Sequence, residues 1–179
     1  HHSKLIPQGV SVLKIPQQKV WLVFRNYHLD WQGQELTQIL KRVQQWENAG
    51  NHIQGIQIDF DAKTKHIHQY ALFLSQLRKQ LPQHYQLSIT GLMDWTNVTN
   101  QETLNLLNNT IDELVIQTYQ SSTTIPNYAA YLKKVSALKL PYKIGIVQYG
   151  EWHRPPKLEN DPNFKGYVVF LLRSKPQNN

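Results

Sequence analysis

Runs typical of β-strands alternate with runs typical of amphipathic helices, and this alternation restricts the fold more than any other feature of the sequence. The strand-like runs are rich in β-branched and aromatic residues, while apolar residues recur at helical spacing in the segments between them. We expect strands at residues 19–25, 52–60, 85–93, 113–119, 143–149 and 166–173, and helices near residues 36–46, 67–81, 99–107 and 128–138. Alternation at this spacing produces βαβ units, so we expect an α/β protein with a parallel sheet.

The length of the chain limits how complete such a sheet is. The 179 residues contain six strong strand signals and a weaker seventh at residues 10–13. A closed eight-stranded (β/α) barrel usually needs about 200 residues or more. The alternatives are therefore a trimmed barrel, a fragment of a longer chain and an open doubly wound sheet. We expect one domain at residues 4–173, after a tag remnant at residues 1–3 and before a flexible tail at residues 174–179.

Composition excludes several kinds of site and partner. The chain has no cysteine, which rules out disulfides and thiolate metal sites. Its net charge of +7 comes from scattered lysines and arginines, so no nucleic-acid partner is expected. No apolar run reaches the ~18 residues of a transmembrane segment. Glycine-rich nucleotide motifs are absent, and His66 and His68 have no third ligand nearby in the sequence, so neither a cofactor nor a metal is expected.

The expected strand at residues 52–60 is polar on one face. Side chains alternate along a strand, so Gln57, Asp59 and the following Asp61 point away from the apolar residues at positions 56, 58 and 60. A central strand of an open parallel sheet is covered by helices on both faces and is apolar nearly throughout. A barrel resolves the conflict, because its helices cover the apolar face while the polar face lines the interior. We therefore predict a TIM-barrel-like fold of six or seven parallel strands, incomplete at its N-terminus.

Asp59 and Asp61 are the strongest candidates for catalytic groups. Their Cα atoms lie about 7 Å apart on one face of the strand. Burial and mutual repulsion favour the protonated form of at least one carboxyl, which is the form that a general acid requires. The structural alternative is an ion pair in which Arg25 binds one carboxylate and stabilises the barrel.

Side chains suited to sugars follow several other expected strands. Aromatic rings stack on the CH faces of sugars, while amides and carboxylates hydrogen bond to their hydroxyl groups. Together with Gln57, the candidate binding residues are Arg25, Tyr27, Asp94, Trp95, Gln117, Tyr119, Gln148, Glu151 and Trp152. A polysaccharide or oligosaccharide is therefore the expected partner.

Residues 54–61 resemble the signature strand of the family 18 glycoside hydrolases, Asp-Gly-x-Asp-x-Asp-x-Glu. In this register Gly55 matches the glycine, Asp59 matches the third aspartate, which assists catalysis, and Asp61 matches the glutamate that donates the proton. Gln54 and Gln57 replace the first two aspartates, and Asp61 is one methylene shorter than glutamate. The resemblance thus implies a site whose activity is altered or lost.

A second segment carries the same resemblance. Residues 117–120 (Gln-Thr-Tyr-Gln) are similar to the Met-x-Tyr-Asp strand of that family, which implies that Tyr119 holds the acetamido group of an amino sugar. A substrate-assisted reaction needs a carboxylate that orients the acetamido group and an acid that protonates the leaving oxygen. The resemblance assigns these roles to Asp59 and Asp61.

A closer resemblance is to a bacterial family called domain of unknown function 3142. It covers about residues 18–173 and rests on segments 57–62, 87–95, 112–119 and 142–149. Members of the family are longer at the N-terminus, which implies that the first barrel strands are absent here. The resemblance implies a glycosidase-like barrel that is often exported, with no established reaction.

These observations lead to three functional hypotheses. The first is a carbohydrate-active enzyme that cleaves a glycosidic bond, with Asp61 as proton donor and Asp59 as its partner. The second is a non-catalytic barrel that binds polysaccharide or a protein in the same cleft. The third is an anionic-polymer binder driven by the basic charge, which predicts an affinity that falls steeply with salt.

Overall fold

Seven strands form one sheet in the computed structural model, which describes residues 6–7, 19–156 and 158–170. Six strands are parallel, in the order β2, β3, β4, β5, β8, β9, and the short β1 pairs antiparallel with the free edge of β2. These strands are β1 (Ile6–Pro7), β2 (Lys19–Arg25), β3 (His52–Asp59), β4 (Gln86–Leu92), β5 (Glu113–Gln117), β8 (Tyr142–Val147) and β9 (Phe164–Phe170). A separate hairpin of β6 (Tyr119–Gln120) and β7 (Thr123–Thr124) follows β5.

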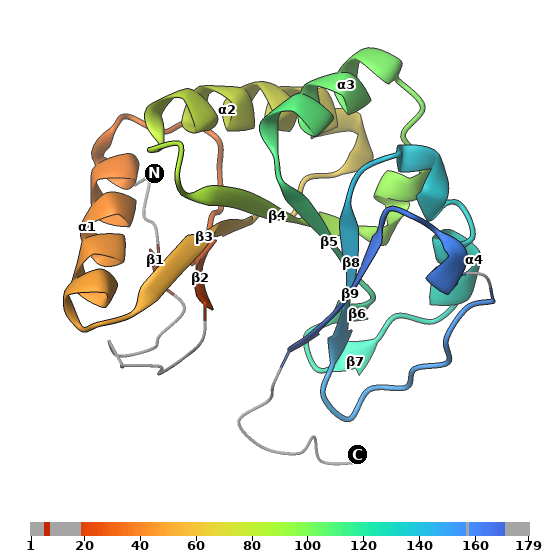
Figure 1. Cartoon of the computed structure of the whole chain (residues 1–179). Coiled ribbons are helices and arrows are strands. Elements are labelled where there is room, and N and C mark those ends of the chain that lie inside the picture. The colour runs from red at the N-terminus through yellow and green to blue at the C-terminus, as the bar shows by residue number, and fades with distance from the viewer. Residues whose placement is uncertain (1–5, 8–18, 157, 171–179) are drawn as a thin grey trace.

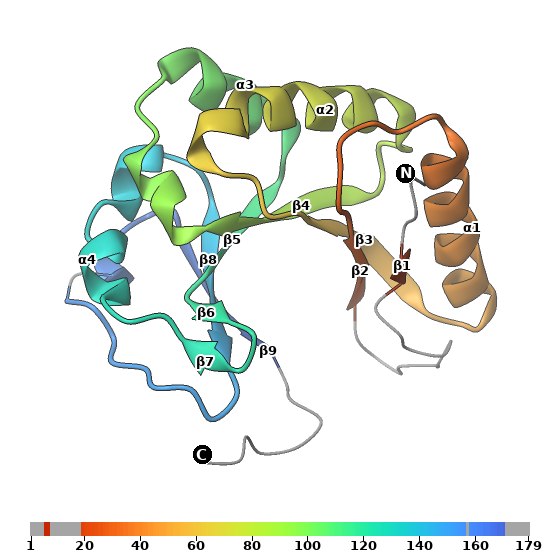
Figure 2. The ribbon, with the colours of Figure 1, turned by 180° about the vertical axis from the view of Figure 1, so that it is seen from behind.

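The sheet curls into a half-barrel that carries its helices on the outer, convex side (Figures 1 and 2). The helices are α1 (Gln34–Asn48), α2 (Ile67–Gln80), α3 (Gln101–Thr110) and α4 (Tyr128–Leu132). Strands β2 and β9 stand on opposite sides of the open mouth of the curl (Figure 1). The predicted α/β class and incomplete TIM-barrel-like sheet are confirmed. The doubly wound alternative is wrong, because its helices would cover both faces of the sheet.

The hydrophobic core lies between the convex face of the sheet and the helices. Ile56 and Ile58 of β3 are fully buried there, which confirms the predicted apolar face of this strand. Helix α2 contributes Tyr70 and Leu74, which are equally buried and belong to the same cluster. Burial of each large apolar side chain contributes roughly 1.5–3 kcal/mol, so this layer holds the strands of the site in place.

Helix α3 begins where the sequence predicts a helix, but a different residue caps it. The pattern Thr-Asn-Gln-Glu at residues 99–102 predicts Thr99 as the cap. In the structure Asn100 is the cap, and its side-chain oxygen accepts a hydrogen bond of 3.0 Å from the backbone N–H of Thr103. Asparagine is at least as good an N-cap as threonine. Leu104 and Leu107 of this helix are buried in the core, as the sequence predicts.

Other elements differ from the prediction near the end of the chain. The helix expected at residues 128–138 is two shorter pieces, α4 and a 3₁₀ helix at Val135–Leu138. The last strand begins two residues earlier than predicted, at Phe164. The β6–β7 hairpin was not predicted. The weak strand at residues 10–13, the tag remnant and the tail at 174–179 lie outside the described residues.

Candidate functional site

The concave side of the half-barrel carries the polar face of β3. The β2–β3 register pairs Arg25 with Asp59, and the β3–β4 register pairs Ile58 with Ile89, which brings Thr90 beside Asp59 on the other side. Because residues paired in a parallel sheet point to the same face, Arg25, Asp59 and Thr90 meet at the carboxyl ends of three adjacent strands. The predicted orientation of this face is confirmed.

One guanidinium group bridges the two candidate carboxylates. Arg25 Nη1 lies 3.1 Å from Asp59 Oδ1, and Arg25 Nη2 lies 2.7 Å from Asp61 Oδ2. Thr90 Oγ1 donates a further hydrogen bond of 2.9 Å to Asp59 Oδ1. A positive charge between the two carboxylates therefore offsets their expected mutual repulsion. The alternative of an ion pair between Arg25 and one carboxylate is found in a wider form, because Arg25 pairs with both aspartates.

A second polar row crosses the concave face nearer the amino ends of the strands. Ser88 Oγ makes long hydrogen bonds of 3.4 Å to Gln57 Oε1 and to Glu113 Oε1. Lys143 Nζ then lies 2.9 Å from Glu113 Oε2. Gln57 therefore links the strands beneath the aspartate pair, and it does not line the cavity described next.

A cavity of about 600 Å³ opens in front of the Arg25–Asp59–Asp61 cluster. Half of the predicted site residues line it: Arg25, Asp59, Asp61, Asp94, Gln117 and Tyr119. Asp61 is the most accessible carboxylate of the pair, with 52% of its side chain exposed, whereas Asp59 is 20% exposed. The cavity is large enough for a small ligand and presents acids, amides and a phenol together.

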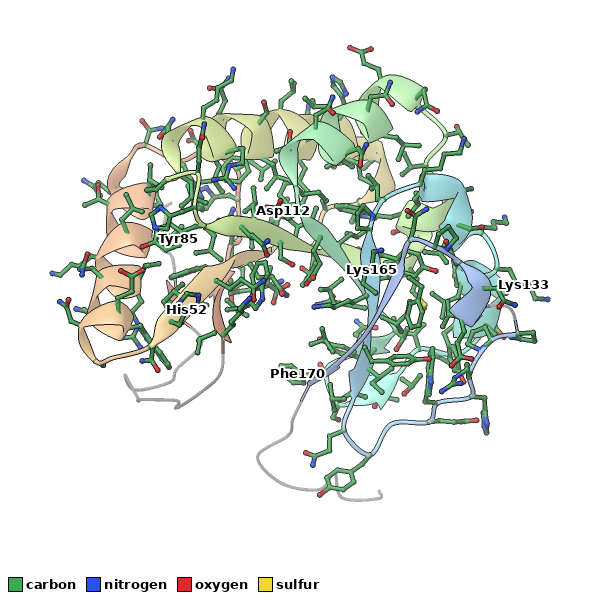
Figure 3. All side chains as sticks on the ribbon, in the orientation of Figure 1. His52, Tyr85, Asp112, Lys133, Lys165 and Phe170 are labelled. Atoms are coloured by element: carbon green, nitrogen blue, oxygen red, sulfur yellow. The ribbon has the colours of Figure 1, made fainter. Side chains whose placement is uncertain are left out.

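Tyr119 has a neutral phenol that faces this cavity. Burial, together with the negative charge of Asp59, raises the pKa of Tyr119 to about 12, while a hydrogen bond with Gln117 acts in the opposite direction. Its ring stacks on Phe170, with centroids 5.5 Å apart and an interplanar angle of 21°. Phe170 lies at the end of β9 beside the open mouth of the curl (Figure 3). At neutral pH Tyr119 is thus able to donate a hydrogen bond to a ligand.

Two predicted aromatic residues have other surroundings. Tyr27 is 58% exposed, and the guanidinium carbon of Arg25 lies 5.0 Å from the centre of its ring. Trp95 is only 1% exposed, and its indole N–H donates a 2.8 Å hydrogen bond to the carbonyl of Ala62. The ring of Trp95 belongs to the core, so the expectation that it offers a stacking surface to a sugar is corrected.

The predicted residues after β8 do not line the cavity either. Trp152 stacks on Tyr128, with centroids 5.0 Å apart, and meets the ring of Tyr167 edge-on. Glu151 is largely exposed and lies 3.2 Å from His153. The backbone N–H of Gln148 donates to the carbonyl of Phe170 and so holds the end of β9. Trp152 therefore anchors the loop that follows β8.

Several lining residues are absent from the predicted site, because they belong to the unpredicted hairpin or to helix α4 and not to the end of a predicted strand. The hairpin supplies Gln120 and Ser121, the segment after it supplies Ile125, and α4 supplies Tyr131. Ser121 has a φ of 52°, in the left-handed region that sequence signals usually mark with glycine or asparagine. The turn that builds this wall therefore has no clear signal in the sequence.

The histidine pair noted in the sequence lies away from the cavity. His66 is exposed, and His68 Nδ1 lies 2.9 Å from Thr103 Oγ1 on the neighbouring helix. In the part of the chain that the structure describes, no three histidine, aspartate or glutamate side chains are grouped as metal ligands. None of the helices described there is both long and apolar enough to cross a membrane.

The fold and the site define a half-barrel of the (β/α) type with an arginine-bridged pair of aspartates at the carboxyl ends of its strands. A family model described as a domain of unknown function (DUF3142) matches residues 28–151, well over half of the chain. The chain belongs to this family. No curated protein matches the sequence.

One solved structure with a similar fold is the Bacillus cereus spore cortex-lytic enzyme SleL. The match has a TM-score of 0.50 and 20% sequence identity, and it covers 73% of this chain. It covers 36% of the SleL chain, so the present chain spans about a third of that protein. At this identity the similarity concerns the fold.

Proposed function

We propose that the cavity of the half-barrel binds a glycan that contains amino sugars and that the chain acts on it as a glycoside hydrolase. The observation that carries the proposal is that Asp59 and Asp61, the positions similar to the family 18 signature, line one cavity together with Tyr119. Tyr119, Gln117 and Asp94 would bind the sugar. The similarity in fold to a spore cortex-lytic enzyme supports a role on a carbohydrate polymer.

In the proposed reaction the two aspartates have different roles. Asp61 is the more exposed and gives a proton to the glycosidic oxygen as the bond to the leaving sugar breaks. Asp59 is held on one oxygen by Arg25 and Thr90, and its carboxylate orients the N–H of the acetamido group. The acetamido oxygen, which accepts a hydrogen bond from the neutral phenol of Tyr119, attacks the anomeric carbon as the leaving sugar departs and forms a cyclic oxazolinium ion. Water then attacks the anomeric carbon, opens this ring and returns a proton to Asp61.

One observation favours a second candidate, a barrel that binds glycans without cleaving them. Arg25 contacts both carboxylates and occupies Oδ2 of Asp61 at 2.7 Å. A proton donor must turn toward the glycosidic oxygen, so an ion pair that holds Asp61 against Arg25 opposes its catalytic role. In the binding candidate the same cavity holds the sugar and the ion pair only shapes its wall.

Turnover and affinity, measured side by side on a soluble oligomer of N-acetylglucosamine, separate the two candidates. For an enzyme, Asp61→Asn abolishes product formation while the Kd changes less than tenfold. For a binding protein, wild type releases no product and the Kd is nearly the same in wild type and Asp61→Asn. Asp112→Asn is the matched control, since Asp112 precedes β5 at the opposite end of the strands. Absence of both binding and turnover across a glycan panel would refute the proposal.

The resemblance also implies an exported protein, and we include this location in the proposal. Fractionation of the native cell tests it by immunoblotting of the envelope and secreted fractions. Recovery of the protein in the cytoplasmic fraction alone would contradict it.

A further inference from the structure

We infer that Arg25 is a positioning residue that clamps Asp59 and Asp61 as one carboxylate pair, rather than a ligand for the sugar. The catalytic meaning of this clamp rests on the proposed function, whereas the clamp itself is a property of the free protein.

The geometry of the contact supports the clamp. The two terminal nitrogens of one guanidinium reach two different carboxylates, at 3.1 Å on Asp59 and 2.7 Å on Asp61. A planar guanidinium offers donors in a fixed fork, so it fixes the separation of the two acceptors as well as their charge. The Tyr27 ring lies against the guanidinium, 5.0 Å from centroid to Cζ, and restricts its motion further.

Thr90 makes the hold on Asp59 stronger than the hold on Asp61. Asp59 Oδ1 accepts both from Arg25 Nη1 and from the hydroxyl of Thr90, which is buried on β4. Asp61 follows the end of β3, and its side chain is 52% exposed. The clamp thus anchors one carboxylate in the barrel wall and tethers a more exposed one beside it.

The charges around the pair explain why a clamp is needed. Among the cavity-lining residues that the structure describes, Arg25 is the one basic side chain, against the acids Asp59, Asp61 and Asp94. Besides Tyr27, the phenols near the pair include Tyr70 of α2, which is fully buried, and Tyr119 after β5. The hydrogen bond to Asp61 and the charges of both aspartates raise the pKa of Arg25 above its ordinary value, despite its burial. Without this cation the two carboxylates would face each other across about 7 Å of one strand.

The clamp has a consequence for a sugar that binds beside Asp61. The contact with Arg25 Nη2 occupies Asp61 Oδ2 in the free protein. Because the side chain of Asp61 is 52% exposed, a bound sugar can replace this contact without disturbing Asp59.

A thermal double-substitution cycle on the free protein tests the clamp. At neutral pH and low salt, we expect Asp61→Asn to lower the Tm in wild type, because it removes a charged acceptor of Arg25. In the Arg25→Gln background we expect the same substitution to raise the Tm, because it removes a carboxylate that repels Asp59. This reversal of sign is specific to a shared cation, and added salt should reduce it.

Asp112→Asn supplies the matched control for the cycle. Asp112 is 47% exposed, close to the 52% of Asp61, and it pairs with Arg78 at 3.9 Å. It lies before the start of β5, whereas Asp61 follows the end of β3. Its substitution should shift the Tm equally in both backgrounds. If Arg25→Gln does not fold, Arg25→Lys replaces it, because lysine keeps the charge and lacks the fork. In that background the loss of Tm caused by Asp61→Asn should be smaller than in wild type.

The outcomes separate the clamp from the proposed function. Shifts of Asp61→Asn that have the same sign and size in all backgrounds would overturn the clamp. A Kd for the N-acetylglucosamine oligomer that weakens tenfold or more in Arg25→Lys, with an additive Tm cycle, would make Arg25 a sugar ligand instead. The cycle needs no glycan, so it decides the clamp even where neither binding nor turnover is found.

Discussion

Gly55 allows a close approach of backbone and side chains under the candidate site, and Gly55→Ala should therefore destabilise the protein strongly. A Cβ added at Gly55 would lie 2.3 Å from the carbonyl oxygen of Gln86 on β4 and 2.7 Å from Cζ3 of Trp21 on β2. Ordinary contact begins at 3.4 Å. The oxygen belongs to the backbone of the neighbouring strand, so β3 and β4 must separate by about 1 Å at this point, a shift typical of overpacked cores.

The expected cost follows from this displacement. Overpacking costs about 1–3 kcal/mol, and the upper end applies because a strand rather than a flexible side chain must move. For a chain of this length each kcal/mol lowers the Tm by about 2–4 °C, which predicts a fall of about 6–12 °C. The same separation would lengthen the 2.9 Å contact between Asp59 and Thr90, so glycan affinity should fall as well.

Calorimetry and urea unfolding of Gly55→Ala and Gly33→Ala measure the effect against a control. The added Cβ at Gly33 meets nothing within 4 Å, but its φ of 94° strains any other residue. That strain costs about 1–2 kcal/mol for an L-residue in the left-handed region, which is below the cost expected at Gly55. A Gly55→Ala protein as stable as Gly33→Ala, with unchanged glycan affinity, would refute the assignment of close packing at Gly55.

Two further predictions concern the core and the tyrosines. Trp95→Phe removes the hydrogen bond to the Ala62 carbonyl and should lower the free energy of unfolding by about 1–3 kcal/mol. The glycan Kd should stay unchanged. A weaker affinity would show that Trp95 contributes to glycan binding after all. Burial and the Glu47 hydrogen bond raise the pKa of Tyr85 to about 12, and burial does the same for Tyr119. These values lie above the unfolded value of about 10. The contribution of the two neutral phenols to the free energy of unfolding should therefore be fully present below pH 10 and decline as the pH rises toward 12. Urea unfolding across this range, with tyrosinate absorbance as the titration probe, checks it, and stability that stays constant up to pH 12 contradicts it.

The sequence predicts the sheet and the polar face well, because both depend on local periodicity. Alternation between neighbouring residues is enough to place Asp59 opposite Ile58, and the order of strands follows from parallel βαβ units. The wall of the cavity is harder to predict from the sequence, because the β6–β7 hairpin turns through Ser121 at positive φ without a glycine. The position of the hairpin depends instead on tertiary contact, since Thr124 of β7 packs closely on Gly150. A Cβ added at Gly150 would lie only 2.4 Å from Thr124 Oγ1.

The residues after β4 show why strand ends are the least predictable positions. Asp94 and Trp95 are neighbours in sequence, and both follow a strand whose end faces the cavity. The chain there forms a 3₁₀ helix at Met93–Asn97, in which successive side chains point about 120° apart. Asp94 consequently lines the cavity while Trp95 enters the core. Side chains alternate between the two faces only as far as the strand extends. Beyond it, the observed turn decides which of the two residues lines the cavity.

The amide at Gln57 bears on how far the resemblance to the glycoside hydrolase signature extends. A carboxylate in that position would stand on the same face as Asp59, and Ser88 would connect it to Glu113 as well. Lys143 already pairs with Glu113, and Arg25 already serves two aspartates, so a further negative charge would have neither as a free counter-ion. A neutral amide keeps the hydrogen bond to Ser88 without that cost. The departure at Gln57 is therefore consistent with the surrounding charges, and it restricts the transferable part of the signature to Gly55, Asp59 and Asp61.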